Sequence, residues 1–166
     1  MRIRSRAARI SRAARGALGL GLVLTLVACR RDEGELPPPL PSFAPALEVD
    51  LSAMDESDTH LYVRVLQEGA GDPAQDQERI GVTYTGWLPD GTQFDSNAGR
   101  EPLAVTLGKD FLIDGFMEGL TGLRPGEERQ LVVPPALAYG PAGDPGVIPR
   151  NSWLVFRVRR ADVPAR

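Results

Sequence analysis

Short runs in which apolar and polar residues alternate, separated by turns rich in glycine and proline, dominate the chain from His60 onward. In the first run Leu61, Val63 and Val65 alternate with other residues, and this period of two predicts a β-strand. Further runs that predict strands lie at residues 79–87, 92–94, 102–107, 128–133 and 152–160. The 18 glycines and 15 prolines, which interrupt helices, make a helix bundle a poor alternative.

One segment has the spacing of a helix instead of a strand. Within residues 111–123, Leu112, Phe116 and Leu120 recur at helical intervals and predict one short helix, although glycines interrupt it. Several strands around a single short helix predict an α+β domain on an antiparallel sheet, over residues 58–162, followed by a tail at 163–166.

The first residues have the composition of a bacterial export signal. Residues 1–28 contain six arginines and no acid, and they end in a 13-residue apolar run that begins at Gly16. That run fits a signal peptide and is shorter than the roughly 20 residues that span a bilayer. Its end, Leu-Val-Ala before Cys29, resembles the lipobox of bacterial lipoproteins, so we predict a lipoprotein signal peptide and lipidation of Cys29. An ordinary signal peptide that contains a cysteine is the alternative.

The segment after Cys29 predicts a spacer. Residues 29–57 include five prolines and have neither helical nor strand periodicity, which predicts a disordered, proline-rich tether. A proline-rich ligand for a partner domain is the alternative interpretation. The predicted location is the cell envelope, with the domain facing the periplasm. Arg30 occupies the place where an Asp often retains such lipoproteins at the inner membrane, and this favours the outer membrane.

Charge and residue counts exclude several classes of function. Without residues 1–28 the chain keeps 13 basic and 22 acidic residues, a net charge of −9, which argues against binding to nucleic acid. One cysteine and one histidine leave no disulfide and no zinc cluster, so we expect no cofactor and no metal.

Five motifs, in order and in register, identify a family. They are VTYTGW at 82–87, DGTQFDS at 90–96, EPLAVTLG at 101–108, the run 111–140 and the run 144–158. On these motifs the chain resembles the FKBP-type peptidyl-prolyl cis/trans isomerases, and the resemblance covers essentially Leu61 to Val158. The resemblance implies a curved antiparallel sheet wrapped around one short helix, with an apolar pocket between them.

The resemblance also implies the site residues. The predicted catalytic residues are Tyr84, Phe94, Asp95, Ile113, Tyr139 and Phe156, and the predicted substrate-binding residues are Leu103, Leu112, Phe116 and Val147. Apolar side chains would hold a proline ring, while the Ile113 N–H and the Tyr139 hydroxyl would orient flanking carbonyls and Asp95 would lie at the edge. Leu103 and Phe116 replace larger aromatic residues of the family, which bears on macrolide affinity more than on activity. Without the motifs, the phenylalanines would be read as ordinary core residues.

We therefore predict an isomerase that accelerates X–Pro isomerisation in exported proteins and takes proline-containing polypeptides as substrates. Rotation of an X–Pro bond needs an apolar, water-poor pocket and no nucleophile or metal, which suits a chain poor in such groups. Macrolide inhibitors are implied ligands, and we expect a monomer held at the membrane through the lipid. The alternatives are a module or chaperone that binds proline loops with little turnover, and a mainly structural envelope lipoprotein.

Overall fold

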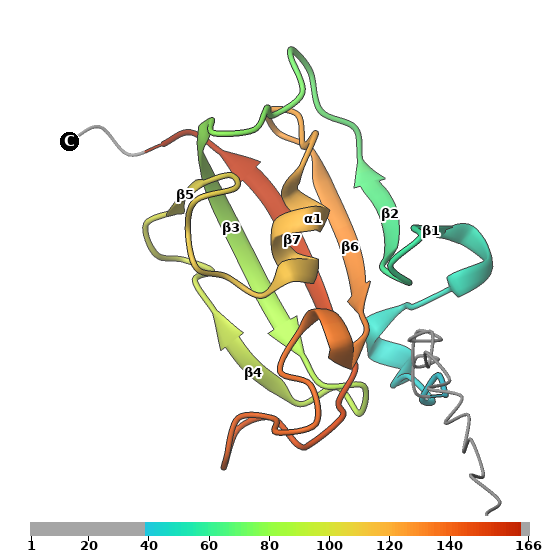
Figure 1. The fold of residues 1–166 in the computed structure, drawn as a ribbon. Helices are drawn as coiled ribbons and strands as arrows, with labels where there is room; N and C mark the ends of the chain where they lie inside the picture. The colour runs from blue at the N-terminus through green and yellow to red at the C-terminus, as the bar shows by residue number, and fades with distance from the viewer. Residues whose placement is uncertain (1–38, 164–166) are drawn as a thin grey trace, which may run out of the picture. The chain divides into compact units, whose positions relative to one another are not determined.

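Seven antiparallel strands form one sheet that curves around a single short helix (Figure 1). The computed structural model describes residues 39–163. The strands are β1 (Asp55–Glu56), β2 (Tyr62–Gln67), β3 (Arg79–Trp87), β4 (Gln93–Ser96), β5 (Leu103–Thr106), β6 (Glu128–Val133) and β7 (Leu154–Ala161). The helix is α1 (Asp114–Leu120), and three 3-10 turns are η1 (Pro45–Leu47), η2 (Leu51–Ala53) and η3 (Pro135–Leu137). This architecture confirms the predicted α+β class.

The order of the strands places β7 at the centre of the sheet. The order is β1-β2-β6-β7-β3-β4, with β5 paired to the other half of β3. Every paired strand is antiparallel to its neighbour, and Tyr84 of β3 lies opposite Val158 of β7. Because β3 is shared by β4 and β5, the sheet splays open at this side, and the opening faces α1 (Figure 1).

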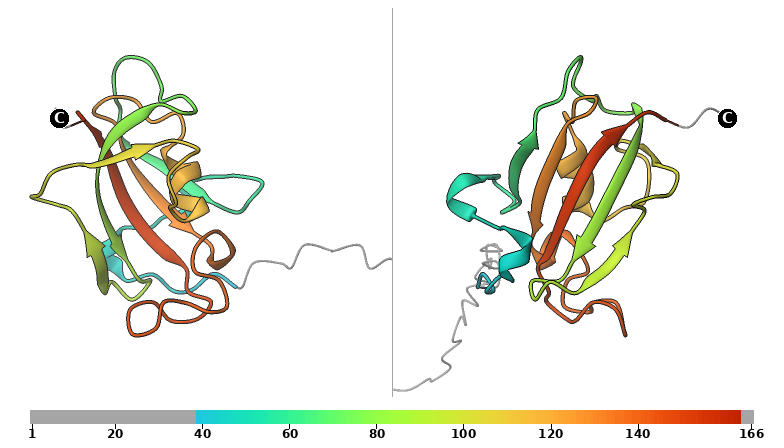
Figure 2. Two further views of the ribbon diagram at one scale, coloured as in Figure 1. Left: turned by 60° about the vertical axis from the view of Figure 1, so that its left-hand side comes forward. Right: turned by 180° about the vertical axis from the view of Figure 1, so that it is seen from behind.

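The main core lies between α1 and the concave face of the sheet (Figure 2). Leu120 and Leu123 are fully buried there, against Leu131 and Val133 of β6. Full burial of an aliphatic side chain of this kind contributes about 1.5–3 kcal/mol, so this layer stabilises the helix more than its short sequence can.

The helix is shorter than predicted, and its glycines have a packing role. It covers Asp114–Leu120 instead of 111–123, because Ile113 before it and Thr121 after it are extended. A Cβ at Gly115 or Gly119 would collide with side chains of β6, so these glycines allow close contact between helix and sheet. The residues that weaken the helical pattern are therefore the ones that let the helix pack.

The structure corrects the predicted tether at residues 29–57. Its described part from Phe43 to Met54 packs on the convex face of the sheet, and Leu47 is only 5% exposed there. Trp153 and Val155 lie beneath it, and the buried Gln130 amide donates to the Leu47 carbonyl at 2.6 Å. We call residues 43–56 the strap. It escapes a periodicity search because its apolar residues lie on and around two short 3-10 turns and follow no regular spacing.

The predicted signal peptide and Cys29 lie outside the described residues, as do residues 164–166 of the predicted tail. Between residues 39 and 163, no helix has the length and apolar character needed to cross a membrane.

Candidate active site

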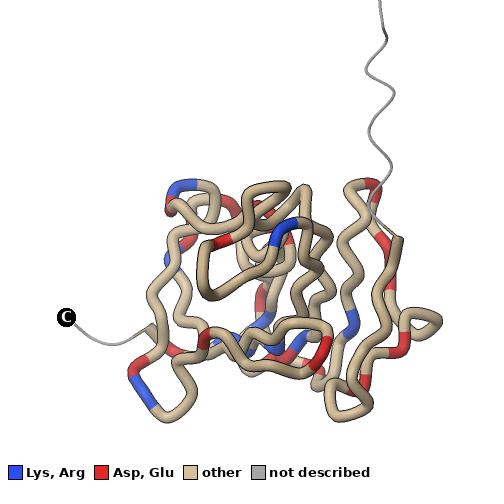
Figure 3. Tube along the Cα trace, turned by 90° about the horizontal axis from the view of Figure 1, so that it is seen from below, with Lys and Arg blue, Asp and Glu red and all other residues tan. Residues whose placement is uncertain are grey.

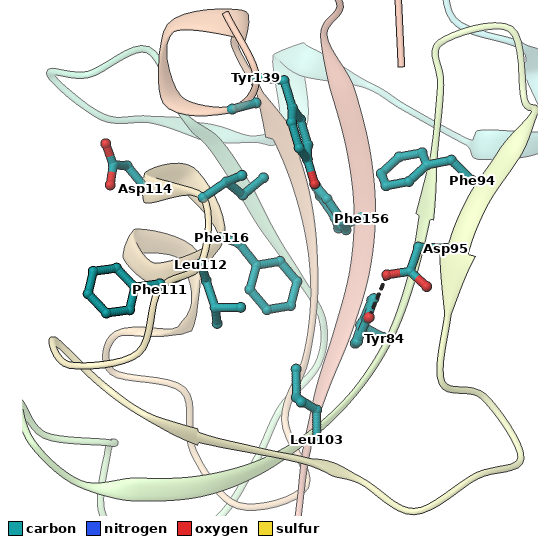
Figure 4. A pocket seen from close by; sticks show the side chains of 12 residues that line it. Tyr84, Phe94, Asp95, Leu103, Phe111, Leu112, Asp114, Phe116, Tyr139 and Phe156 are labelled. Carbon is teal, nitrogen blue, oxygen red and sulfur yellow. Dashed lines mark hydrogen bonds between the residues drawn. The ribbon is translucent and has the colours of Figure 1, made fainter. Parts of the chain in front are cut away.

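A cavity of about 490 Å³ opens between the start of α1, the splayed strands and the loop after β6 (Figure 4). Its lining residues are Tyr84, Phe94, Asp95, Leu103, Phe111, Leu112, Ile113, Asp114, Phe116, Ala138, Tyr139 and Phe156. Most of these side chains are apolar, so the cavity suits a small apolar ring.

Four aromatic rings form the floor and one wall. Phe116 of α1 contacts Phe156 of β7 edge to face at 5.2 Å between ring centroids, and Tyr84 of β3 at 5.4 Å. Phe94 of β4 contacts Phe156 in the same manner at 5.6 Å. Edge-to-face contacts at these distances are favourable, so the four rings pack together as one apolar cage.

Gly86 makes this aromatic contact possible. It lies in β3 opposite Phe156, and a Cβ at this position would stand 2.7 Å from both Phe156 Cε1 and Phe94 Cζ. Any side chain here would separate the two rings. Gly86 does not stand out in the sequence, because its role depends on two residues from other strands.

One wall of the cavity carries a hydrogen-bonded pair of polar residues. The Tyr84 hydroxyl donates to Asp95 Oδ2 at 2.6 Å, and Asp95 Oδ1 accepts from the Ser96 N–H at 2.8 Å. Burial, followed by the Asp95 hydrogen bond and charge, raises the pKa of Tyr84 to about 12. The phenol is therefore neutral at physiological pH and remains a donor to the carboxylate.

Asn97 positions this pair and was missed by the sequence analysis. Its side-chain oxygen accepts from the Tyr84 N–H at 2.7 Å, and its amide donates to the Val82 carbonyl at 2.9 Å. It thus continues the pairing of β3 by side-chain bonds where β4 ends. The segment 95–99 looks like ordinary turn chemistry in the sequence, which hid this contribution.

Two free hydrogen-bond donors belong to residues that line the cavity. Within residues 39–163 the Ile113 N–H, at the N-cap of α1, has no acceptor. Tyr139 is about 39% exposed, and burial together with the negative charges of Asp144 and Asp95 raises its pKa. Both donors are free to bind carbonyl groups of a peptide.

The structure brings together nine of the ten predicted pocket residues and excludes one. Val147 does not line the cavity: it is 48% exposed and borders a separate hollow in the loop 142–150. A bridge between Asp144 and Ile148 closes this loop and directs Val147 outward. The predicted role of Val147 as a pocket residue is therefore wrong for this structure, and Phe111, Asp114 and Ala138 are lining residues that the prediction missed.

The described residues give no arrangement suited to a metal. Among residues 39–163, no three His, Cys, Asp or Glu side chains come close enough together to ligate an ion.

Comparison with known proteins identifies the family of this fold and site. The family model described as FKBP-type peptidyl-prolyl cis-trans isomerase matches residues 71–159. An "FK506-binding protein" of Neisseria meningitidis serogroup A is 44% identical over 99 residues, which cover 59% of this chain and 91% of that protein. The "FKBP-type peptidyl-prolyl cis-trans isomerase FkpA" of Escherichia coli K12 is 45% identical over 108 residues, 64% of this chain but only 39% of that protein.

Solved structures agree with this result. The crystal structure of FkpA from Escherichia coli superposes with a TM-score of 0.60 at 41% identity, covering 69% of this chain and 53% of that one. A peptidyl-prolyl cis-trans isomerase from Pseudomonas syringae superposes with a TM-score of 0.61 at 26% identity, covering 73% and 87%.

Proposed function

The chain belongs to the FKBP-type peptidyl-prolyl cis-trans isomerases, and on that basis we propose that it isomerises X–Pro bonds of exported proteins at a bacterial cell envelope. The family membership makes the chain a peptidyl-prolyl isomerase whose substrates are proline-containing polypeptides. The residue roles, the envelope location and the lipid anchor are proposals. The observation that carries the residue roles is the apolar aromatic cage lined by two residues with free donors.

The cage lowers the barrier through its low polarity. An X–Pro bond rotates slowly because amide resonance gives it partial double-bond character, with a barrier of about 18–20 kcal/mol. Rotation breaks this resonance, so the twisted amide has less charge separation than either planar state. A proline ring seated on Phe116, between Tyr84 and Phe156, would carry its amide into surroundings that favour the twisted form over the planar ones.

The polar groups hold the peptide in place during rotation. The Ile113 N–H and the Tyr139 hydroxyl bind carbonyls on the two sides of the proline, so that one side is held while the other turns. Asp95 accepts from Tyr84 and keeps that phenol fixed against the ring. Leu103 and Leu112 complete the apolar wall.

A nuclear magnetic resonance exchange experiment tests this assignment. Substoichiometric full-length chain should speed cis/trans exchange of a short X–Pro peptide, and a variant with Asp95→Ala and Tyr139→Phe should lose most of that acceleration. A folded protein that binds the peptide without accelerating exchange would instead establish the proline-loop binding module. Acceleration that survives in the double variant would place catalysis outside this cavity.

The envelope location is supported by the sequence of residues 1–29. An arginine-rich start, a short apolar run and Cys29 follow one another in the order of a lipoprotein signal, and Arg30 favours the outer membrane. Labelled palmitate should enter the wild-type chain and not a Cys29→Ala variant, and membrane fractionation should find the wild type in the outer membrane. A wild-type chain that is exported but carries no label would leave only an ordinary signal peptide.

The same cavity is the proposed site for macrolide inhibitors, since relatives of this chain are named FK506-binding proteins. Phe116, 4% exposed, makes a smaller floor than an indole would, and Leu103 gives a shallower wall than a phenyl ring. Calorimetric titration with FK506 tests this, with competition against the substrate peptide as the readout. We also propose that the chain is a monomer, which sedimentation of the purified protein checks.

A further inference from the structure

Phe111 is an exposed aromatic residue at the mouth of the cavity. Its ring is fully exposed, although it lines the cavity together with the partly exposed Leu103 and Tyr139. These are three of the six large apolar side chains that the described residues leave exposed. At the rim of a binding cavity, an exposed phenyl ring is available for contact with a ligand.

The charged groups of the cavity are all acidic. Of the residues that line it, only Asp95 and Asp114 carry charge. Asp95 already accepts from Tyr84, whereas Asp114 is exposed and has no hydrogen bond or ion pair within residues 39–163. Figure 4 shows Phe111 and Asp114 on the same side of the cavity, at the start of α1. Three positions apart, they bracket Ile113, whose N–H is free.

We propose that Phe111 and Asp114 form a subsite for a cationic side chain, in particular arginine, that flanks the proline of the substrate. This inference rests on the isomerase function. The planar guanidinium of an arginine can stack on the Phe111 ring and form an ion pair with the Asp114 carboxylate. The apolar part of the arginine side chain would then lie over the rim of the cavity. A peptide carbonyl bound at the Ile113 N–H brings the neighbouring side chain of the peptide to this rim.

The nearby cations and acids are compatible with this reading. Lys109 and Asp110 precede Phe111, and the Asp110 carboxylate is turned back to accept from the Thr106 N–H at 2.7 Å. Arg100 acts electrostatically on Tyr84. Tyr84 lies on the wall of the cavity opposite the start of α1 (Figure 4). Acidic and basic residues are interspersed along the described trace (Figure 3), so the preference depends on local contacts rather than on one broad field.

Two other roles for these residues lead to different results. Asp114 stands in the first turn of α1, where a negative charge stabilises a helix, but that role affects stability and not substrate choice. Phe111 could insert into a lipid surface near the proposed anchor. The Asp114 carboxylate on the same side of the cavity would be repelled by anionic lipid, so the structure favours a peptide ligand.

The test compares peptides that differ only beside the proline. Arginine, citrulline and glutamate are placed before the proline in one series and after it in another, and kcat/KM is measured for the full-length chain. We expect the arginine peptide to exceed citrulline by about threefold and glutamate by more, in at least one series, with the advantage shrinking at high salt. Asp114→Asn and Phe111→Ala should each remove most of this advantage.

The controls separate failure of the subsite from failure of the isomerase. Asp72→Asn, an exposed carboxylate outside the cavity, should keep the full preference. Equal catalysis of all peptides by the wild type overturns the subsite and leaves the isomerase intact, whereas no catalysis of any peptide removes the isomerase itself. A Phe111→Ala variant that loses binding to vesicles of phosphatidylethanolamine and phosphatidylglycerol, yet keeps peptide preference, overturns the proposal in favour of a membrane contact.

Discussion

Replacing Gly86 by alanine should damage the cavity more than the fold. The added Cβ would stand 2.7 Å from Phe156 Cε1 and from Phe94 Cζ. Carbon atoms in good contact lie about 3.5 Å apart, so the rings must withdraw by about 0.8 Å in total at each contact. Phe156 is buried against Phe116 and has little room, while Phe94 is only half-buried. We therefore expect Phe94 to move outward.

The magnitudes follow from where that movement occurs. Overpacking in a core costs about 1–3 kcal/mol, and a ring that can relax toward solvent keeps the loss near about 1 kcal/mol. Activity should suffer more, because displacement of a binding wall by about 1 Å lowers catalysis by up to about a hundredfold. Urea unfolding measures the first quantity, and exchange of an X–Pro peptide followed by nuclear magnetic resonance measures the second.

A double-mutant cycle with Phe94→Ala checks the cause. If the Cβ acts by displacing this ring, Gly86→Ala should cost little further stability once Phe94 has been truncated, while activity stays low. Wild-type activity in Gly86→Ala would show that the added Cβ does not displace a wall of the cavity. Fully additive losses of stability would place the strain at Phe156 or in the backbone of β3.

Three further predictions concern the same scaffold. The pKa of Tyr84 is raised to about 12 from an ordinary value of 10.0, so this residue should ionise after the other tyrosines in an ultraviolet titration. Its contribution to stability is present below pH 10 and is lost as the pH rises from there through its folded pKa. Ionisation of Tyr84 near pH 10 would contradict the burial of its hydroxyl. Asn97→Ala should lower the free energy of unfolding in urea by about 2 kcal/mol, because the Tyr84 N–H and the Val82 carbonyl lose their hydrogen-bond partner. The same substitution should lower kcat/KM. An unchanged kcat/KM would show that Asn97 does not position Tyr84. Leu47→Ala should cost about 2 kcal/mol by the same method with kcat/KM unchanged, and a loss below about 0.5 kcal/mol would show that the strap is not held against the sheet.

The strands could be predicted because their pattern is local. The predicted run 79–87 coincides with β3, since alternating residues there face the core and the convex side in turn. The helix was overestimated because Ile113 before it and Thr121 after it are extended, and apolar spacing does not report backbone conformation. Boundaries of this kind depend on φ and on packing partners, and a single sequence records them weakly.

The site divides in the same way. Residues carried by strands and by the start of α1, such as Tyr84 and Phe116, occupy the cavity as the family motifs imply. Val147 does not, because it stands in a long loop whose path is fixed by the Asp144–Ile148 bridge. Asn97 and Gly86 escaped notice for a different reason: each acts through residues of other strands, which motif matching by position does not consider.

The strap did leave a signal in the sequence, although not within its own residues. Residues 131–133 and 153–156 are continuous apolar runs rather than alternating ones, and such runs indicate strands buried on both faces. In β7, Phe156 faces the cavity and Val155 faces the strap; in β6, Leu131 and Val132 divide in the same way. One helix covers only one face of the sheet, so these runs require a second cover. The apolar residues from Phe43 to Met54 supply it, and the back of the active-site strands is thereby kept from water.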